Sequence, residues 1–283
     1  MMSPEFEVRG ARMKTGTPRT PNPEPRTALA ELLLTLADDE FVLGFWDSEW
    51  TGIAPMLEED VAFSSLAQDE IGHARVLYEI LAELTHDTAD HIAYGRQPEE
   101  YRHARLLDHS RTDWAFSIAR RFLYDTADAT RLTVLANSSY APLAGIVGKI
   151  RREETYHRMH MEAWVKRLAE AGGEAHQRLS VALETLWPDA LTIFTPFDGE
   201  EELLNAGILP EPLMAIQQRW LGEIASFLQP LGLPFPFREA GGGRYTPTFP
   251  ITMDSGRIRH SDDFRWLWNE FTMVYRAEPG AEW

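Results

Sequence analysis

Four long runs of helical periodicity constrain the fold of this chain more than any other feature of its 283 residues. In each run apolar side chains recur every three or four positions, as they do along the buried face of a helix. The runs cover residues 27–50, 57–85, 113–138 and 142–171. At 1.5 Å per residue each helix would be about 40 Å long, and four such helices predict an all-α bundle.

The connections between the runs indicate which kind of bundle to expect. Short links join the first run to the second and the third to the fourth, whereas the polar segment 86–111 separates the two pairs. A single long crossover between two helical hairpins is typical of ferritin-like proteins. Further helices are expected after Pro98 (a short one) and over residues 174–196, 211–228 and 261–275. The predicted fold class is a ferritin-like four-helix bundle with additional C-terminal helices.

This division of the chain predicts three parts. Residues 1–26 contain five prolines and no continuous apolar stretch, so we expect a disordered or loosely attached tail and no signal peptide. Residues 27–228 form the ferritin-like bundle. Residues 229–283 are rich in proline, glycine and aromatic residues, and we expect this C-terminal extension to pack on the bundle or on a partner chain.

Charge and cysteine content exclude several classes of function. The chain has 44 acidic and 27 basic residues and a formal net charge of −17, so it should repel phosphate backbones and anionic lipid. No apolar window approaches the length of a membrane helix. We therefore expect a cytoplasmic protein with no nucleic-acid and no membrane partner. The absence of cysteine excludes iron–sulfur ligation and thiol catalysis.

Two of the predicted helices carry a glutamate and a histidine three residues apart. These pairs are Glu70 with His73 in the second run and Glu154 with His157 in the fourth. Residues at this spacing share one helix face, so both members of a pair can bind one metal centre. Four pairs of acid and histidine have this spacing, where composition alone predicts about one. The other two lie at a helix end and in the polar segment, and we interpret them as chance matches: Glu83–His86 and Glu100–His103.

The other two helices of the predicted bundle each supply a single acid in an apolar setting. Glu40 precedes Glu70 by 30 residues, and Asp125 precedes Glu154 by 29 residues, so the two halves of the chain repeat one plan. Asp128, one turn beyond Asp125, is an alternative to it. Carboxylates and imidazoles from four helices are typical of a dinuclear centre of iron or manganese. The predicted metal ligands are Glu40, Glu70, His73, Asp125, Glu154 and His157.

An acidic residue also precedes each glutamate of the two paired motifs. A histidine that binds a metal usually donates its other ring N–H to an outer carboxylate, which fixes the tautomer. Asp69 is expected to serve His157, and Glu153 is expected to serve His73, in both cases across the bundle.

With these motifs the sequence resembles the phenylacetic acid catabolic proteins, the ferritin-like components of the bacterial phenylacetyl-CoA epoxidase complex. In that family the A-type protein carries a di-iron site, and the C-type protein is its structural partner and has typically lost the ligands. The features similar to the A type are Glu40, Gln68 to His73, Asp125, Ser139 to Pro142 and Glu153 to His157. The features similar to the C type are Ser48 to Asp60, Tyr156 to His157, Trp164 to Leu168 and Pro279 to Trp283.

The resemblance implies a di-iron oxygenase component. Such a component activates O₂ reductively and inserts one oxygen atom into the aromatic ring of phenylacetyl-CoA, while the second oxygen leaves as water. Electrons would come from NADPH through a separate reductase that carries flavin and an iron–sulfur cluster. The implied partners are an aromatic acyl-CoA, O₂, the reductase, and a sister ferritin-like subunit or a second copy of this chain.

Two other functions remain open at this point. The first is a non-catalytic subunit that scaffolds a catalytic sister chain, which the C-type features favour. The second is an iron-storage or peroxide-consuming bundle, which would share the ligands but not the aromatic C-terminal extension.

Overall fold

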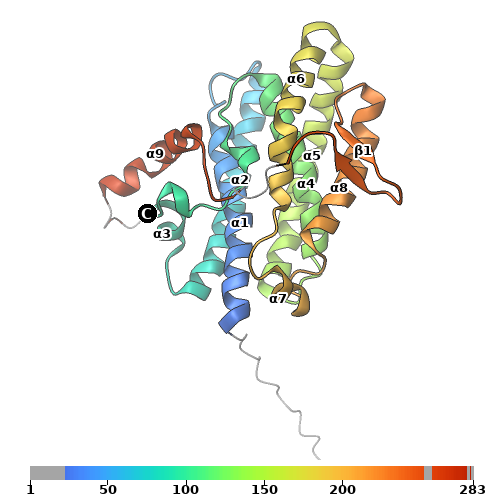
Figure 1. Ribbon diagram of the computed structural model, residues 1–283. Coiled ribbons are helices and arrows are strands. Elements are labelled where there is room, and N and C mark those ends of the chain that lie inside the picture. The colour runs from blue at the N-terminus through green and yellow to red at the C-terminus, as the bar shows by residue number, and fades with distance from the viewer. Residues whose placement is uncertain (1–22, 252–256, 279–280, 282–283) are drawn as a thin grey trace, which may run out of the picture.

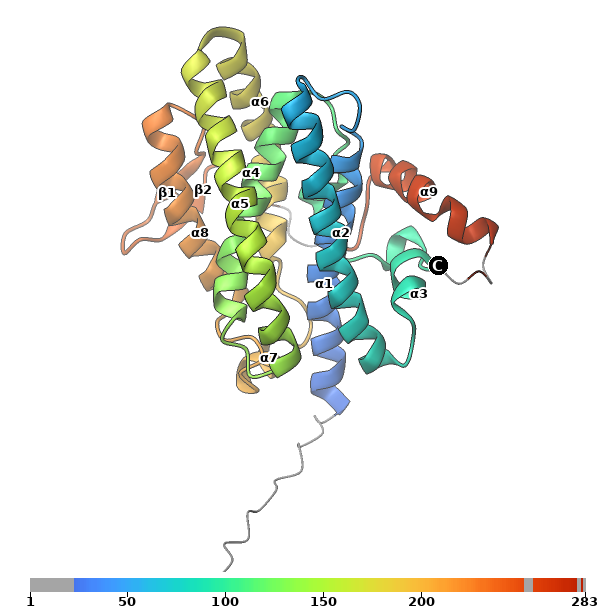
Figure 2. The same cartoon turned by 180° about the vertical axis from the view of Figure 1, so that it is seen from behind.

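Two helical hairpins pack side by side in the computed structural model, which describes residues 23–251, 257–278 and 281 (Figures 1 and 2). The first hairpin consists of α1 and α2, and the second of α4 and α5. Their bounds are Pro23–Ser48 for α1, Leu57–Thr85 for α2, Trp114–Leu135 for α4 and Ala141–Ala171 for α5. This arrangement confirms the predicted ferritin-like, all-α fold. Each of the four helices begins and ends within four residues of its expected limits.

The largest difference lies at the start of α1. The helix begins at Pro23, inside the tail expected over residues 1–26. Proline is accepted in the first turn of a helix, because the N–H that it lacks has no partner there in any case. The remainder of the expected tail, residues 1–22, lies outside the described residues.

The crossover between the hairpins is held against α1 by two consecutive aspartates. It contains the helix α3 and two 3₁₀ helices, η1 and η2: Ala89–Tyr94, Pro98–Glu100 and Arg105–Asp108. The Asp38 carboxylate accepts the backbone N–H of Arg102 at 2.6 Å, and Asp39 accepts that of Ala104 at 2.7 Å. The short helix expected after Pro98 is η1, whereas α3 was not predicted, because its six residues are too few for a periodic pattern.

Additional helices cover the outer side of the second hairpin (Figures 1 and 2). Their bounds are Gly173–Ala190 for α6, Leu191–Phe194 for η3, Glu200–Asn205 for α7, Leu213–Leu228 for α8 and Gln229–Leu231 for η4. Trp187 on α6 and Trp220 on α8 are fully buried and lie against each other. The Trp220 indole donates a hydrogen bond of 2.9 Å to Thr126 Oγ1 on α4. These contacts fix α4, which contributes to the candidate site described below.

The C-terminal extension packs on its own bundle in two places. Its hairpin pairs β1, Phe237–Glu239, with β2, Tyr245–Pro247, in an antiparallel register, and the Phe235 and Phe237 rings contact Trp187. Its last helix, α9 (Asp262–Ala277), lies beside α3 on the opposite side of the molecule (Figures 1 and 2). There Phe271 packs on Phe41 of α1. None of the described helices combines the length and the apolar character that a membrane-spanning segment requires.

Candidate metal centre

Side chains from three helices of the bundle converge on one buried point. Glu40 comes from α1, Glu70 and His73 come from α2, and Glu154 comes from α5. One potential ligand atom of each of these four residues lies within 4.8 Å of those of the other three. All four side chains are buried, and so are the two remaining predicted ligands, Asp125 on α4 and His157 on α5. The helical periodicity places the motif residues inward because the apolar residues on the same faces form the core.

Both histidine rings turn Nδ1 toward the cluster and Nε2 toward the surface. His73 Nδ1 lies 3.2 Å from Glu40 Oε2, and His157 Nδ1 lies 3.0 Å from Glu154 Oε1. His73 Nε2 lies 2.7 Å from Glu153, and His157 Nε2 lies 3.2 Å from Asp69. These outer pairs join α2 to α5 across the bundle, in the combination that the sequence analysis expected. An Nε2–H that donates to a carboxylate leaves Nδ1 free to bind a metal ion.

Two glutamates lie between the histidines. Glu154 Oε1 is 3.4 Å from His73 Nδ1 and 3.0 Å from His157 Nδ1. Glu70 presents Oε1 to His157 at 3.3 Å and Oε2 to His73 at 3.8 Å. Each of these carboxylates can therefore bind a metal ion beside either histidine.

The hydrogen bonding of the cluster is incomplete in the way that a metal site requires. Both carboxylate oxygens of Glu70 and Glu154, Nδ1 of His157 and Oδ1 of Asp125 are buried and have no hydrogen-bond partner among the described residues. Buried polar atoms without partners are costly and uncommon. Carboxylate oxygens and imidazole nitrogens are the donors that iron and manganese prefer. The residues present therefore fit the metal ions that the sequence predicted.

The electrostatics of the cluster reflect this crowding of acids. Burial and the nearby Glu70 carboxylate raise the pKa of Glu40 well above its ordinary value. Burial by itself lowers the pKa of His157, but the close approach of its Nδ1 to the Glu154 and Glu70 carboxylates outweighs burial and raises that pKa to about 11. The cluster without metal thus favours cationic histidines, because a positive charge must balance the buried carboxylates.

A tyrosine completes the α1 side of the cluster. The Tyr124 hydroxyl, on α4, donates a hydrogen bond of 2.7 Å to Glu40 Oε1, while Glu40 Oε2 faces His73. Arg131 in turn donates to the Tyr124 oxygen at 3.2 Å. Glu40 is therefore held in one orientation, with one oxygen directed at the cluster.

The two alternative aspartates of α4 have different partners. Asp128 forms an ion pair of 2.7 Å with Arg131. Asp125 pairs with Arg121 at 3.2 Å, and burial raises the pKa of Asp125 well above its ordinary value although the Arg121 charge lowers it. Because Arg121 also lies 2.7 Å from Glu70, Asp125 is connected to the cluster through a shared cation, and we keep Asp125 as the proposed ligand.

Arg121 is the site residue that the sequence analysis missed. Its guanidinium is fully buried and lies 2.6 Å from Asp47, 2.7 Å from Glu70 and 3.2 Å from Asp125. The approach to Glu70 has ion-pair distance but lacks hydrogen-bond geometry. The spacing of four residues to Asp125 was the available signal, since it places both side chains on one helix face.

The comparisons with known proteins agree with the motifs. Residues 13–283 match the model of a family described as phenylacetic acid catabolic protein. The chain belongs to this family. It is 26% identical over 258 residues to the C-type component of the 1,2-phenylacetyl-CoA epoxidase of Escherichia coli (strain K12), an alignment covering 90% of the chain and 99% of that component. It is 27% identical over 278 residues to the A-type component of the same epoxidase, covering 95% of the chain and 84% of that component.

The predicted resemblance of this phenylacetic acid catabolic protein is thereby confirmed. The identities to the two components are nearly equal, so overall similarity does not separate them. The distinction depends on the buried carboxylates and histidines described above.

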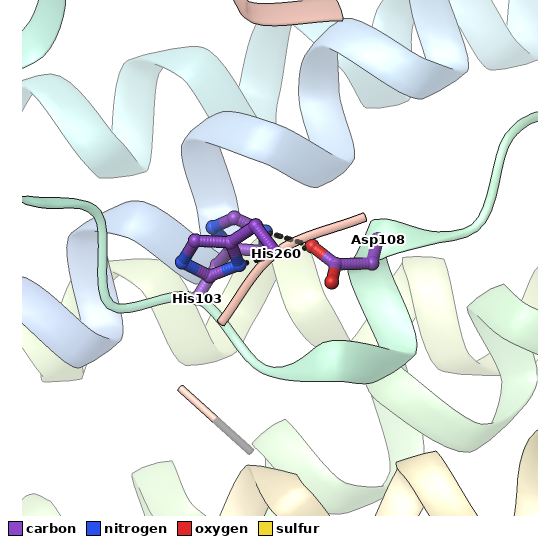
Figure 3. A group of neighbouring side chains, drawn as sticks. All are labelled: His103, Asp108 and His260. Carbon is purple, nitrogen blue, oxygen red and sulfur yellow. Dashed lines mark hydrogen bonds and ion pairs between the residues drawn. The ribbon is translucent and has the colours of Figure 1, made fainter. Parts of the chain in front are cut away.

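A second group of potential ligands lies between the crossover and the start of α9. His103 Nε2 and His260 Nδ1 both contact Asp108 Oδ1, at 2.7 Å and 3.0 Å (Figure 3). From the sequence, Glu100–His103 was interpreted as a chance match because it lies in the polar segment; the partner that His103 meets, His260, is far away along the chain. The two imidazoles are stacked, with centroids 4.0 Å apart and planes only 17° from parallel. A metal ion cannot lie in the planes of two stacked rings, so we interpret this group as a hydrogen-bonded clasp.

Proposed function

We propose that this phenylacetic acid catabolic protein is the metal-binding, oxygen-activating component of an aromatic acyl-CoA monooxygenase of the phenylacetyl-CoA epoxidase type. The observation that carries the proposal is the group of buried carboxylates and histidines, in which both carboxylate oxygens of Glu70 and of Glu154 and Nδ1 of His157 have no hydrogen-bond partner among the described residues. A protein with only a scaffolding role has no need for such a costly arrangement.

The proposed ligands take distinct roles. The residues that would hold two iron ions, or manganese in their place, are Glu40, Glu70, His73, Asp125, Glu154 and His157. The metal centre would supply two-electron reduction of O₂, so that one oxygen atom enters the aromatic ring and the other leaves as water with two protons. Asp69 and Glu153 hold a proton at the Nε2 atoms of the histidines and keep both Nδ1 atoms directed inward.

A groove between α4, α5 and α8 lies on the surface beside the cluster. It has a volume of about 270 Å³, and Glu154 is part of its wall. Three arginines also line it: Arg151, Arg158 and Arg219. Guanidinium groups bind phosphate well. The groove therefore supports an acyl-CoA substrate whose phosphates rest on the arginines at the surface while its acyl end points toward Glu154.

The proposed reaction depends on partner chains. Electrons would arrive from NADPH through a separate flavin and iron–sulfur reductase, because this chain has no cysteine that could bind a cluster. The relatives are components of one epoxidase, which supports a sister ferritin-like subunit as a further partner.

A scaffolding role is the second candidate. It is favoured by the alignment with the C-type component, which covers 99% of that relative, and by the buried Arg121 beside the ligands. In this case the catalytic metal centre would belong to the sister subunit.

Turnover by a reconstituted complex separates the two candidates. The complex would contain this chain, its sister subunit and the reductase, and would be assayed with phenylacetyl-CoA for product formation and NADPH consumption. We expect Glu154→Ala in this chain to reduce turnover at least 100-fold, with Glu170→Ala on the same helix as the control. Full turnover by the Glu154→Ala complex would contradict the proposal and support the scaffold.

A further inference from the structure

The metal cluster has two halves, and each is centred on one histidine. The first half consists of His73 Nδ1, Glu40 Oε2 and Glu70 Oε2. The second half consists of His157 Nδ1 and Glu70 Oε1, and the Asp125 carboxylate is connected to it through Arg121; Glu154 is shared between the halves. The four residues whose ligand atoms converge within 4.8 Å are those of the first half together with Glu154.

Within the described part of the chain, the contacts of Arg121 with the predicted ligands are to Glu70 and Asp125. They join Arg121 to Glu70 Oε1 at 2.7 Å, to Asp125 Oδ1 at 3.2 Å and to Asp125 Oδ2 at 3.4 Å. An arginine stays protonated in proteins, so this positive charge is permanent. The guanidinium lies next to the Glu70 and Asp125 carboxylates, which could otherwise bind a second metal ion.

The position of Arg121 is also fixed from outside the cluster. Its Nη1 donates a hydrogen bond of 2.6 Å to Asp47 on α1, and both side chains are fully buried. Turning the guanidinium away from Glu70 and Asp125 would break this bond and leave the Asp47 charge without its closest partner. Repulsion between a guanidinium and a divalent ion is strong in a buried site, where the effective dielectric constant is low.

We propose that the Arg121 guanidinium is a fixed positive charge in the second half of the cluster and weakens metal binding there. This chain therefore binds one divalent metal ion tightly between Glu40 and His73 and a second one much more weakly. The inference rests on the metal centre of the proposed function, but it is independent of the substrate. It predicts that the two metal positions differ in affinity, whereas the symmetric spacing of the motifs alone would suggest two equal positions.

The neighbouring arginine supplies a matched control. Arg120 is equally buried on the same helix, but its guanidinium donates to the His109 carbonyl at 2.6 Å and lies 3.8 Å from Asp47. No contact between Arg120 and a predicted ligand occurs among the described residues. Removing its charge therefore disturbs the same region without changing the second half of the cluster.

Titration of the metal-free chain with Mn²⁺ tests the proposal. Electron paramagnetic resonance distinguishes an isolated Mn²⁺ ion from a coupled pair, and equilibrium dialysis gives the two dissociation constants. For the wild type we expect an isolated-ion signal at one equivalent and a second dissociation constant at least about 10-fold larger than the first. For Arg121→Gln we expect the two constants to approach each other and the coupled signal to appear near one equivalent. Arg120→Gln should behave as the wild type does.

Several outcomes overturn the inference. If the wild type binds two Mn²⁺ ions with similar affinity, the inference is wrong. This result needs no variant, so the inference can be tested even if Arg121→Gln fails to fold. A folded Arg121→Gln chain with unchanged constants would overturn the inference as well. A wild type that binds no Mn²⁺ overturns both this inference and the metal-dependent function, whereas two equal sites overturn this inference alone.

Discussion

At the scale of single residues, each candidate metal-binding histidine is oriented by a carboxylate on the other hairpin. Glu153 of α5 serves His73 of α2, and Asp69 of α2 serves His157 of α5. The two acids are about half exposed, with 56% and 44% of their side-chain surface accessible, whereas the histidines are buried. An acid at the edge of the core is charged at little cost, so it can hold the ring without adding to the buried charge.

Removing one outer carboxylate should therefore weaken metal binding without changing a ligand. We expect Glu153→Ala to lower the affinity for Mn²⁺ by about 10- to 100-fold, because the His73 ring loses the partner that fixes its tautomer and orientation. Competition with a coloured chelator measures this change. The control is Glu170→Ala, an exposed acid near the C-terminal end of the same helix. Equal affinities in the two variants would show that Glu153 does not position the ring.

The arginines of the groove make a second prediction at this scale. Arg151 lines the groove beside Glu154, whereas its exposed neighbour Arg152 does not. In the reconstituted complex, Arg151→Glu should raise KM for the acyl-CoA about 10-fold or more with little change in kcat, because it repels phosphate without touching the metal ligands. Arg152→Glu should have a much smaller effect. Equal effects of the two substitutions, or a fall in kcat alone, would contradict binding of the substrate in this groove.

At the scale of secondary-structure elements, α4 departs most from what its sequence indicates. Its three buried arginines, Arg120, Arg121 and Arg131, would be assigned to the surface by residue type alone. Their burial is possible because α1 carries buried acids that form ion pairs with them or with other nearby cations. These acids are Asp38, Asp39 and Asp47. Periodicity shows which face of a helix turns inward, but it does not show which charge on a neighbouring helix will meet that face.

The same reasoning explains which parts of the site could be predicted. Glu70 and His73 share a helix turn, and the inward direction of that turn follows from the apolar residues around it, so their meeting was predictable. His103 and His260 meet only because the chain folds back over 157 residues, and no local spacing signals that contact. The helices α3 and α7 were missed because six residues are too short for a periodic signal.

The clasp between the crossover and α9 connects these distant segments. Asp108 accepts hydrogen bonds from both histidines and from the backbone of Ser261, which caps α9. Burial and the neighbouring His260 lower the pKa of His103 to about 4. Burial raises the pKa of Asp108, but the hydrogen bonds from His103 and His260 outweigh burial and lower it below its ordinary value. Both shifts mean that the folded clasp binds protons less readily than the open one.

The clasp should therefore weaken in acid. Its stabilisation is fully present above the unfolded pKa of His103, about 6.5, and is lost as the pH falls toward 4. We expect the free energy of local opening of α9 to fall by about 2 kcal/mol between pH 7 and pH 4.5. Hydrogen exchange of α9, corrected for intrinsic rates, measures it. His103→Phe should remove most of this pH dependence, whereas Glu270→Gln, an exposed control on α9, should keep it. A His103→Phe chain with the same pH dependence as the wild type would contradict the role of the clasp.

At the scale of the whole molecule, contacts within the chain account for much of the aromatic content of residues 229–283. Phe264 and Phe271 are buried, and Trp266 stacks on Trp46 of α1. The described part of α9 nevertheless leaves Met273 and Val274 more than half exposed. Met273 and Val274 are adjacent on α9, so we expect a partner contact on this face, since apolar side chains that lie together on a surface can mark an interface. The expected partner contact is therefore limited to this face of α9 and does not involve the whole extension of residues 229–283.

Charged substitutions on this face test the contact with a sister subunit or with a second copy of the chain. Met273→Glu and Val274→Glu, at 57% and 52% exposure, should reduce the assembled mass in sedimentation while the helical content of the chain stays unchanged. Val181→Glu on α6, at 54% exposure, is the control and should leave the mass unchanged. An unchanged mass for the α9 variants, in an assembly that does form, would place the interface elsewhere.

The central claim is that this chain binds a redox metal ion in its own buried cluster. Elemental analysis of the full chain, purified from cells grown with ample iron and manganese, tests it most directly. We expect between about one and two metal ions per wild-type chain, and less than about a tenth of an ion per His73→Ala chain that keeps its helical content. A correctly folded wild-type chain that carries no metal, and takes up none when iron is added, would contradict the claim.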